Sequence, residues 1–107
     1  MARLEGLRRL VEDYMRQVSP GLYYSLESAC LKNKGKTCIE LLVENPAELR
    51  EILERKYGSN SSIRIVSRLI IYPIVSRFKG DGIVDDYLNL FLENPSEFKK
   101  RVKEFFS

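Results

Sequence analysis

Glu44-Asn45-Pro46-Ala47-Glu48-Leu49 is followed 49 positions later by Glu93-Asn94-Pro95-Ser96-Glu97-Phe98, and this repeated motif decides how the chain is divided into helices. The hydrophobic register agrees on the N-terminal side of the motif as well, where Leu41-Leu42-Val43 aligns with Leu90-Phe91-Leu92. If a single tripeptide had recurred by chance, the residues around it would not be expected to share the same hydrophobic register. The repeat therefore predicts two similar helical halves within one chain.

Each copy of the motif has the features of a helix start. Asn45 and Asn94 are favourable N-cap residues, and the proline after each suits the first helical turn, where no backbone N–H is needed. Glu48 and Glu97 stand where a capping box places its acidic partner. Each Asn-Pro pair is thus predicted to end one apolar segment and to begin the next helix.

Helical spacing of apolar residues extends the prediction to most of the chain. One face of an amphipathic N-terminal helix carries Leu4, Leu7, Val11, Tyr14, Met15 and Val18. A second helix begins at Ser19-Pro20, a basic loop covers Lys32 to Lys36, and Thr37 with Glu40 opens a third helix that continues to Val43. The remaining expected helices are 46–57, which ends at Gly58, then 83–92 and 95–106.

The segment from Ile63 to Phe78 is open to two interpretations. Its β-branched residues favour a strand that starts at Ile63-Arg64-Ile65. A helix is the preferred interpretation, because Ser59 to Ser62 offer N-caps and a lone strand would lack a partner. Pro73 is expected to kink or split this helix.

These observations predict an all-α fold of six to seven helices. The 107 residues form one domain, which consists of the amphipathic N-terminal helix and two pseudo-repeated halves, roughly 20–58 and 62–107. A homodimer is expected, because the 63–78 helix and the N-terminal helix offer more apolar surface than a core of this size covers.

The composition excludes several classes of function. The chain has no histidine, which removes the commonest general base and the commonest metal ligand, so no catalytic residue, metal or cofactor is expected. No apolar run is long enough to span a membrane, and the charged residues Arg3, Glu5, Arg8 and Arg9 argue against a signal peptide.

Gly35-Lys36-Thr37 is similar to the end of a phosphate-binding loop, but Cys30 occupies the position where that loop needs a glycine. The preferred interpretation is a turn that ends in the Thr37 cap. Cys30 and Cys38 are the only cysteines, and three states stay open for them: a disulfide, two buried thiols or reactive sensor thiols. A disulfide would fit a thermophile, as does the single glutamine among many ion-pairing residues.

Charge is segregated along the chain. Four basic residues and no acidic residue lie between Gly58 and Lys79, whereas five acidic and no basic residues lie between Gly80 and Phe98. Arg64, Arg68 and Tyr72 form one helical stripe, and Lys99, Lys100 and Arg101 form a basic tail. These residues predict a nucleic-acid or partner contact. The alternative is a solvated face that pairs with the acidic segment.

The leading functional hypothesis is a non-catalytic protein-interaction or signalling module. Nucleic-acid association is the second hypothesis, and an enzyme that uses only the carboxylates of Asp85, Asp86 and Glu93 is the third.

Part of the sequence resembles a known class of protein. Three features carry the resemblance: Leu22-Tyr23-Tyr24, the Glu44-Asn45-Pro46 motif with Leu49, Leu53, Tyr57 and Gly58 after it, and the hydrophobic segment Ile63 to Phe78. This pattern resembles small helical archaeal output domains of sensory and regulatory proteins. The resemblance implies an archaeal, cytoplasmic, non-enzymatic regulatory module, and it carries no functional residues over. Pro73 and the second Asn-Pro half depart from the pattern.

Overall fold

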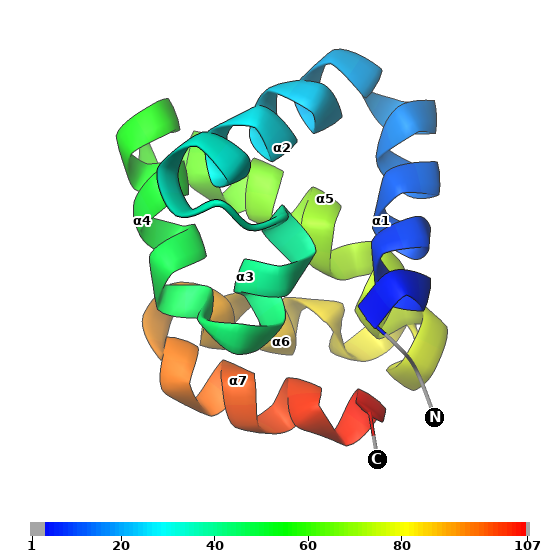
Figure 1. The fold of residues 1–107 in the computed structure, drawn as a ribbon. Helices are drawn as coiled ribbons and strands as arrows, with labels where there is room; N and C mark the ends of the chain where they lie inside the picture. Colours follow the sequence, from blue (N-terminus) through cyan, green and yellow to red (C-terminus); the bar gives the residue numbers. More distant parts are fainter. Residues whose placement is uncertain (1–3, 107) are drawn as a thin grey trace.

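The computed structural model describes residues 4–106, and this part of the chain contains seven α-helices, two 3₁₀ helices and no strand (Figure 1). In chain order the elements are α1 (Leu4–Val18), α2 (Pro20–Lys34), α3 (Cys38–Glu44), α4 (Pro46–Tyr57), α5 (Asn60–Lys79), η1 (Asp81–Ile83), α6 (Val84–Glu93), α7 (Pro95–Val102) and η2 (Lys103–Phe106). The predicted all-α fold is confirmed. Residues 1–3 and 107, at the two ends of the predicted domain, lie outside the described part.

Helix α5 is the central element of the core. It packs against α1 and α4 as well as against α6, and the side chain of Ser59 caps it by accepting a hydrogen bond from the N–H of Ser62 at 3.2 Å. The preferred helical interpretation of 63–78 is therefore confirmed. Pro73 was predicted to kink or split this helix, and the split does not occur, since α5 continues to Lys79. Pro73 itself is buried, and burial of its apolar ring opposes the cost of the backbone hydrogen bond that proline removes.

Most of the apolar surface of α5 is covered within one chain. Eight of its residues are buried, namely Ile63, Val66, Ser67, Ile70, Ile71, Pro73, Ile74 and Val75. On α1, Leu7, Val11 and Met15 are buried, whereas Val18 at the C-terminal end is 52% exposed, in contrast to its predicted place on the apolar face. On α5, Ile65 and Phe78 are the large apolar residues that stay exposed.

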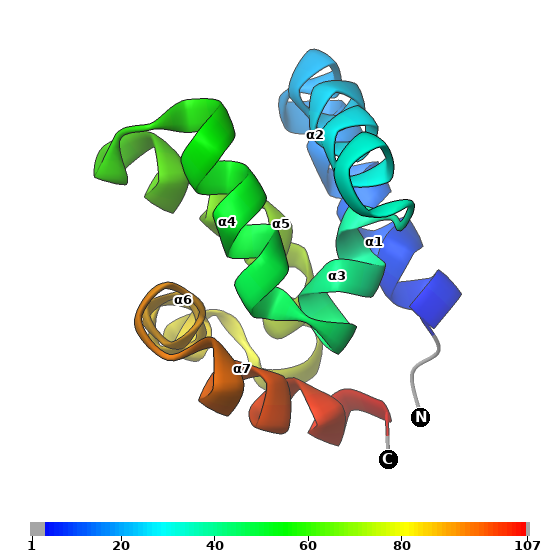
Figure 2. The same cartoon turned by 60° about the vertical axis from the view of Figure 1, so that its left-hand side comes forward.

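The two Asn-Pro motifs adopt nearly the same backbone conformation. Asn45 has φ −151° and ψ 72°, and Asn94 has φ −145° and ψ 74°. The N–H of Asn45 donates to the carbonyl oxygen of Leu41 at 2.8 Å, and the N–H of Asn94 donates to that of Leu90 at 2.7 Å. The helix pairs α3–α4 and α6–α7 are therefore two copies of one helix-Asn-Pro-helix unit, and Figure 2 shows both bends.

The capping predictions hold in part. The predicted capping box of Thr37 and Glu40 is present, but neither Asn-Pro motif forms one. Asn94 accepts a hydrogen bond from the N–H of Glu97 at 3.3 Å, whereas the side chain of Asn45 makes no capping hydrogen bond. The buried ring of Pro46 holds the start of α4 in place of that bond.

Two predicted boundaries need correction. Lys32 to Lys34 belong to α2, which ends at Gly35 with a positive φ of 67°, so the predicted basic loop is shorter. The last α-helix ends at Val102 and continues as the 3₁₀ helix η2.

Candidate functional site

The predicted stripe on α5 is largely engaged by other helices. The Arg68 guanidinium lies 5.3 Å from the centre of the Tyr72 ring, and its Nε lies 3.5 Å from a carboxylate oxygen of Asp85 on α6. The Tyr72 ring lies 5.3 Å from the ring of Tyr14 on α1. Arg64 is exposed. The acidic segment thus pairs with part of the stripe, as the alternative interpretation proposed.

The basic tail does not join that stripe. Lys99, Lys100 and Arg101 lie on α7, and α6 packs against both α5 and α7. Arg101 borders an open hollow of about 450 Å³ together with Asp86 and Glu93. The two predicted basic sets therefore lie on different helices, and carboxylates accompany each of them.

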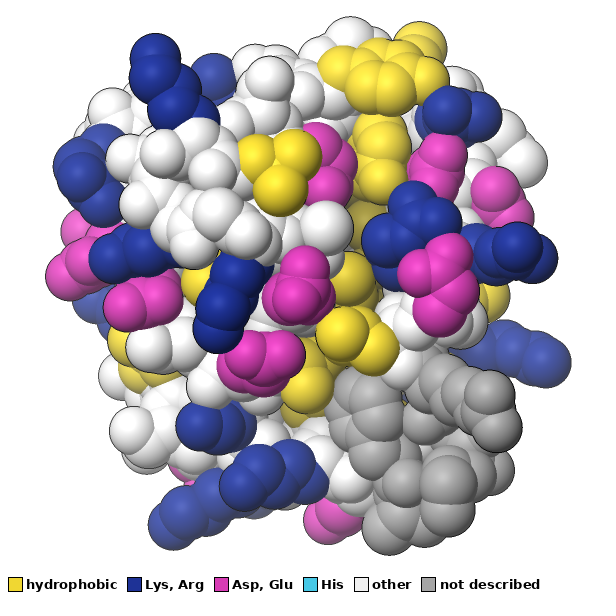
Figure 3. Space-filling model, viewed as in Figure 1, with side chains coloured by type: hydrophobic (Ala, Val, Ile, Leu, Met, Phe, Trp, Pro, Cys, Tyr) yellow, Lys and Arg dark blue, Asp and Glu magenta, His cyan; other side chains and the backbone are white. Residues whose placement is uncertain are grey.

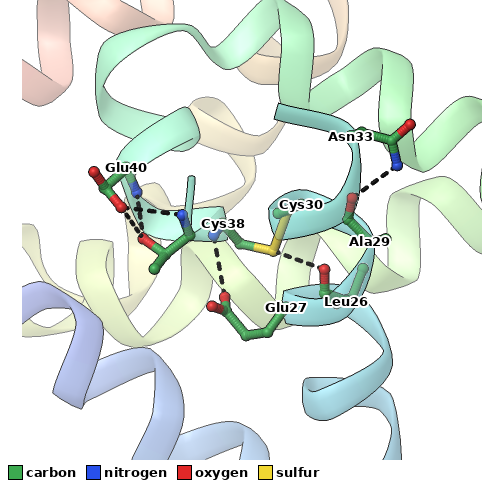
Figure 4. Close-up of a disulfide and its surroundings, with 8 residues drawn as sticks. Leu26, Glu27, Ala29, Cys30, Asn33, Cys38 and Glu40 are labelled. Atoms are coloured by element: carbon green, nitrogen blue, oxygen red, sulfur yellow. Dashed lines mark hydrogen bonds between the residues drawn. A yellow bond between two sulfur atoms is a disulfide. The ribbon is translucent and has the colours of Figure 1, made fainter. Parts of the chain in front are cut away.

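Cys30 of α2 and Cys38 of α3 are joined by a disulfide, with their Cα atoms 5.5 Å apart (Figure 4). Both residues are buried. The N–H of Cys38 donates to a carboxylate oxygen of Glu27 at 3.1 Å, and the Sγ of Cys38 lies 3.2 Å from the carbonyl oxygen of Leu26. Burial raises the pKa of Glu27, and the hydrogen bond from Cys38 opposes this rise. The disulfide thus fixes the C-terminal half of α2 to the start of α3.

Both polar side chains of the Gly35-Lys36-Thr37 turn make interactions within the fold. The Nζ of Lys36 lies 3.0 Å from a carboxylate oxygen of Glu44, and Thr37 caps α3. A bound phosphate would have to displace both interactions. The turn is therefore a poor phosphate site, in agreement with its missing glycine.

A groove between α2 and α4 combines the features of a binding site better than any predicted set of residues. Its volume is about 580 Å³, and it is lined by Ser25, Ser28, Ala29, Lys32 and Asn33 of α2 and by Ile52, Arg55 and Lys56 of α4. Figure 3 shows Lys and Arg side chains over the C-terminal halves of these two helices, at the upper left of the view. We call this feature the α2–α4 groove.

Positive charge dominates the α2–α4 groove. Lys32, Arg55 and Lys56 line it without any carboxylate, and in residues 4–106 none of the three lies within ion-pair distance of an acidic side chain. Three other hollows mix both signs of charge: one has Arg50 and Arg64 with Glu54 and Glu93, a second has Arg101 with Asp86 and Glu93, and a third has Arg55 with Glu51 and Glu54. The α2–α4 groove is therefore suited to an anion.

The sequence contained only a weak signal for this groove. Lys32 and Lys34 stand in the last turn of α2, and Arg55 and Lys56 stand in the last turn of α4. Basic residues are common there, because they complement the helix dipole. The packing of α2 against α4 brings the two basic ends together, and the spacing of residues along the chain does not reveal that packing.

The remaining candidates contribute little chemistry. Among residues 4–106, no group of three or more Cys, Asp or Glu side chains is arranged to hold a metal ion. Asp85 pairs with Arg68, and it does not line the hollow that Asp86 and Glu93 share. In the same part of the chain, no helix combines the length and the apolar character needed to cross a bilayer.

No family model, curated protein or solved structure matches the chain. The resemblance to archaeal output domains stays a prediction, and the functional argument rests on the α2–α4 groove.

Proposed function

We propose that this protein is a non-catalytic interaction or regulatory module that binds a partner protein through the α2–α4 groove. The observation that carries the proposal is the presence of three cations, Lys32, Arg55 and Lys56, in one groove without a carboxylate. Cations that are not neutralised within the chain attract an oppositely charged partner. The partner is therefore expected to present an acidic or otherwise anionic surface.

Nucleic-acid association is the second candidate, and three observations count against it. Arg68 and Tyr72 already contact side chains of other helices. The α2–α4 groove has no aromatic lining residue on which a base would stack. A net charge of +3 is also modest for a protein that neutralises many phosphates.

Homodimerisation and a cytoplasmic location stay predictions. Among the side chains that the structure describes, the large apolar residues that are at least 40% exposed are Val18, Tyr24, Leu31, Ile65 and Phe78. Three of them lie on α1 and α2 and two on α5. Static light scattering on the purified chain would test the dimer, and a monomer would leave the groove as the main interaction surface.

Site-specific photocrosslinking in cells of the source organism tests the proposed function. A photoreactive residue replaces Ser28 in the groove, and the matched control replaces Arg77, an exposed residue near the C-terminal end of α5. We expect a discrete protein adduct from position 28, its loss in the K32E/R55E background, and no such adduct from position 77.

The other outcomes identify the competing functions. An adduct that nuclease removes would support nucleic-acid association, and an adduct of twice the chain mass would show a second copy in the groove. Equal crosslinking from positions 28 and 77 would contradict the proposal.

A further inference from the structure

We infer that the α2–α4 groove recognises a phosphate monoester, such as a phosphorylated serine of the partner. This inference rests on the proposed function and specifies the chemical group that the groove binds. The inference is more specific than the proposed function, because a partner that presents only aspartate or glutamate side chains would also satisfy the proposed function.

The charge of the groove matches a dianion better than a single carboxylate. Lys32, Arg55 and Lys56 provide three positive charges, and no lining carboxylate reduces them. A phosphate monoester carries a charge of about −1.5 to −2 near neutral pH and presents three strong acceptor oxygens. One aspartate or glutamate would neutralise only one of the three cations.

The lining residues also supply the donors that a phosphate requires. The planar guanidinium of Arg55 can donate two parallel hydrogen bonds to two phosphate oxygens, and the ammonium groups of Lys32 and Lys56 act as point charges. The Lys56 ammonium lies 5.9 Å from the centre of the Tyr57 ring. Ser25 and Ser28 add hydroxyl donors on the α2 side. The amide nitrogen of Asn33 already donates to the carbonyl oxygen of Ala29 at 2.7 Å, so Asn33 is not counted among these donors.

The apolar part of the groove limits what can accompany the phosphate. Ala29 and Ile52 are the apolar lining residues, and they offer an aliphatic surface without a ring. A nucleobase would gain no aromatic stacking there. A volume of about 580 Å³ exceeds the space of one phosphate and leaves room for the side chains beside it.

Acidic residues next to the groove should lower its affinity for a phosphate. Arg55 also borders a shallow hollow with Glu51 and Glu54, which lie on its own helix. The Glu54 carboxylate pairs with Arg50 at 2.8 Å, which leaves Glu51 as the carboxylate whose charge would repel an anion at Arg55. Removal of the Glu51 charge should therefore strengthen phosphate binding, which gives the test a gain-of-function arm.

In the test, the protein is titrated with a short peptide that contains one phosphoserine. Binding is measured by isothermal calorimetry and by the shifts of the amide NMR signals. Two control peptides have the same sequence, one with unmodified serine and one with glutamate at the phosphoserine position. We expect only the phosphopeptide to bind, with shifts along α2 and α4. R55A should weaken binding about tenfold and K32A about three- to fivefold, E51Q should tighten it, and R64A should leave it unchanged.

The pH dependence separates phosphate from carboxylate. The second pKa of a phosphate monoester is about 6, so affinity should fall as pH drops from 7.5 to 5.5. The chain has no histidine, the side chain whose charge ordinarily changes in this pH range. Because burial raises the pKa of Glu27 on α2, the E27Q variant serves as a control that should show the same profile.

The outcomes decide between the two proposals. Phosphopeptide binding that K32A and R55A weaken supports the inference. If glucose 6-phosphate binds more tightly than the peptide, the phosphate chemistry is supported, but its source is a small metabolite. Equal binding of the glutamate and phosphoserine peptides, or binding that R55A leaves unchanged, overturns the inference. If the crosslink from position 28 persists in that case, the proposed function stands.

Discussion

The α3–α4 unit and the α6–α7 unit share one backbone bend but are stabilised by different side chains. In the first unit the buried core is aliphatic, the start of α3 has a capping box, and a disulfide ties that start to α2. In the second unit three of the six buried residues are aromatic, and α6 begins after η1 without a side-chain cap. The bend therefore follows from the Asn-Pro backbone, while each unit has its own means of holding its helices.

The aromatic cluster of the second unit is continuous. The rings of Phe91 and Phe98 meet edge to face with centres 5.4 Å apart, and Tyr87 lies 6.4 Å from Phe98 and 5.8 Å from Phe105. Such pairs each add about 0.5–1.5 kcal/mol beyond the burial of their area. In the first unit, Leu42 and Leu49 occupy the positions of Phe91 and Phe98. The second unit thus depends on ring packing where the first depends on a covalent link and a cap.

The largest effect is expected from the aromatic unit. Phe98→Ala should lower the free energy of unfolding by about 3–5 kcal/mol, because it removes a buried ring together with its edge-to-face contacts with Tyr87 and Phe91. Leu49→Ala, at the equivalent position, removes a smaller side chain and should cost less. Urea unfolding followed by circular dichroism measures both losses. An equal or greater loss at Leu49 would show that the two cores do not differ in the way described.

The next effect concerns the disulfide. Replacement of Cys30 and Cys38 by alanine should lower the free energy of unfolding by about 2–3 kcal/mol, because the unfolded chain regains the freedom of a short loop. Differential scanning calorimetry measures the shift in Tm. Because both cysteines are buried in the folded protein, reductant should lower the Tm of the wild type only after the protein has been kept unfolded long enough for the disulfide to be reduced. Reductant should not change the Tm of the double variant. A Tm that is equal in the two proteins would contradict the assigned role.

Local signals explain which parts of this fold were predictable. Thr37, Pro46 and Gly58 act on the turn in which they stand, so the starts and ends of α3 and α4 could be identified from the sequence. The continuity of α5 through Pro73 and the missing side-chain cap of Asn45 depend on burial in the folded chain. The α2–α4 groove depends on how two helices pack, which is why the basic residues of α5 and α7 were the more visible candidates.

The two asparagines offer a finer test of the comparison. Asn94→Ala should cost about 1 kcal/mol, because it removes the side-chain hydrogen bond to the N–H of Glu97. Asn45→Ala should cost less, because that side chain makes no capping bond and Pro46 is buried. Urea midpoints of the two variants, measured side by side, give the difference. Equal losses would show that both motifs depend on their asparagine side chains alike.

The smallest effects concern two carboxylates at the start of α3 whose pKa values are shifted in opposite directions. Hydrogen bonds from the N–H and the hydroxyl of Thr37 lower the pKa of Glu40, whereas burial raises the pKa of Glu27. Glu40 therefore adds stability at neutral pH that is lost as pH falls through its lowered pKa. Glu27 does the opposite: stability declines as pH rises from the unfolded-state pKa to the raised pKa of the folded protein.

Glutamine substitutions should therefore change the stability with opposite signs. At pH 7, Glu27→Gln should stabilise the fold, because the amide oxygen still accepts the N–H of Cys38 and no charge is buried. Glu40→Gln should destabilise it, because the charge that favours the Thr37 hydrogen bonds is lost. Both differences from the wild type should shrink at pH values where the two carboxyl groups are protonated. Urea unfolding between pH 3 and pH 7 measures them, and a shift of the same sign in both variants would show that burial does not dominate at Glu27.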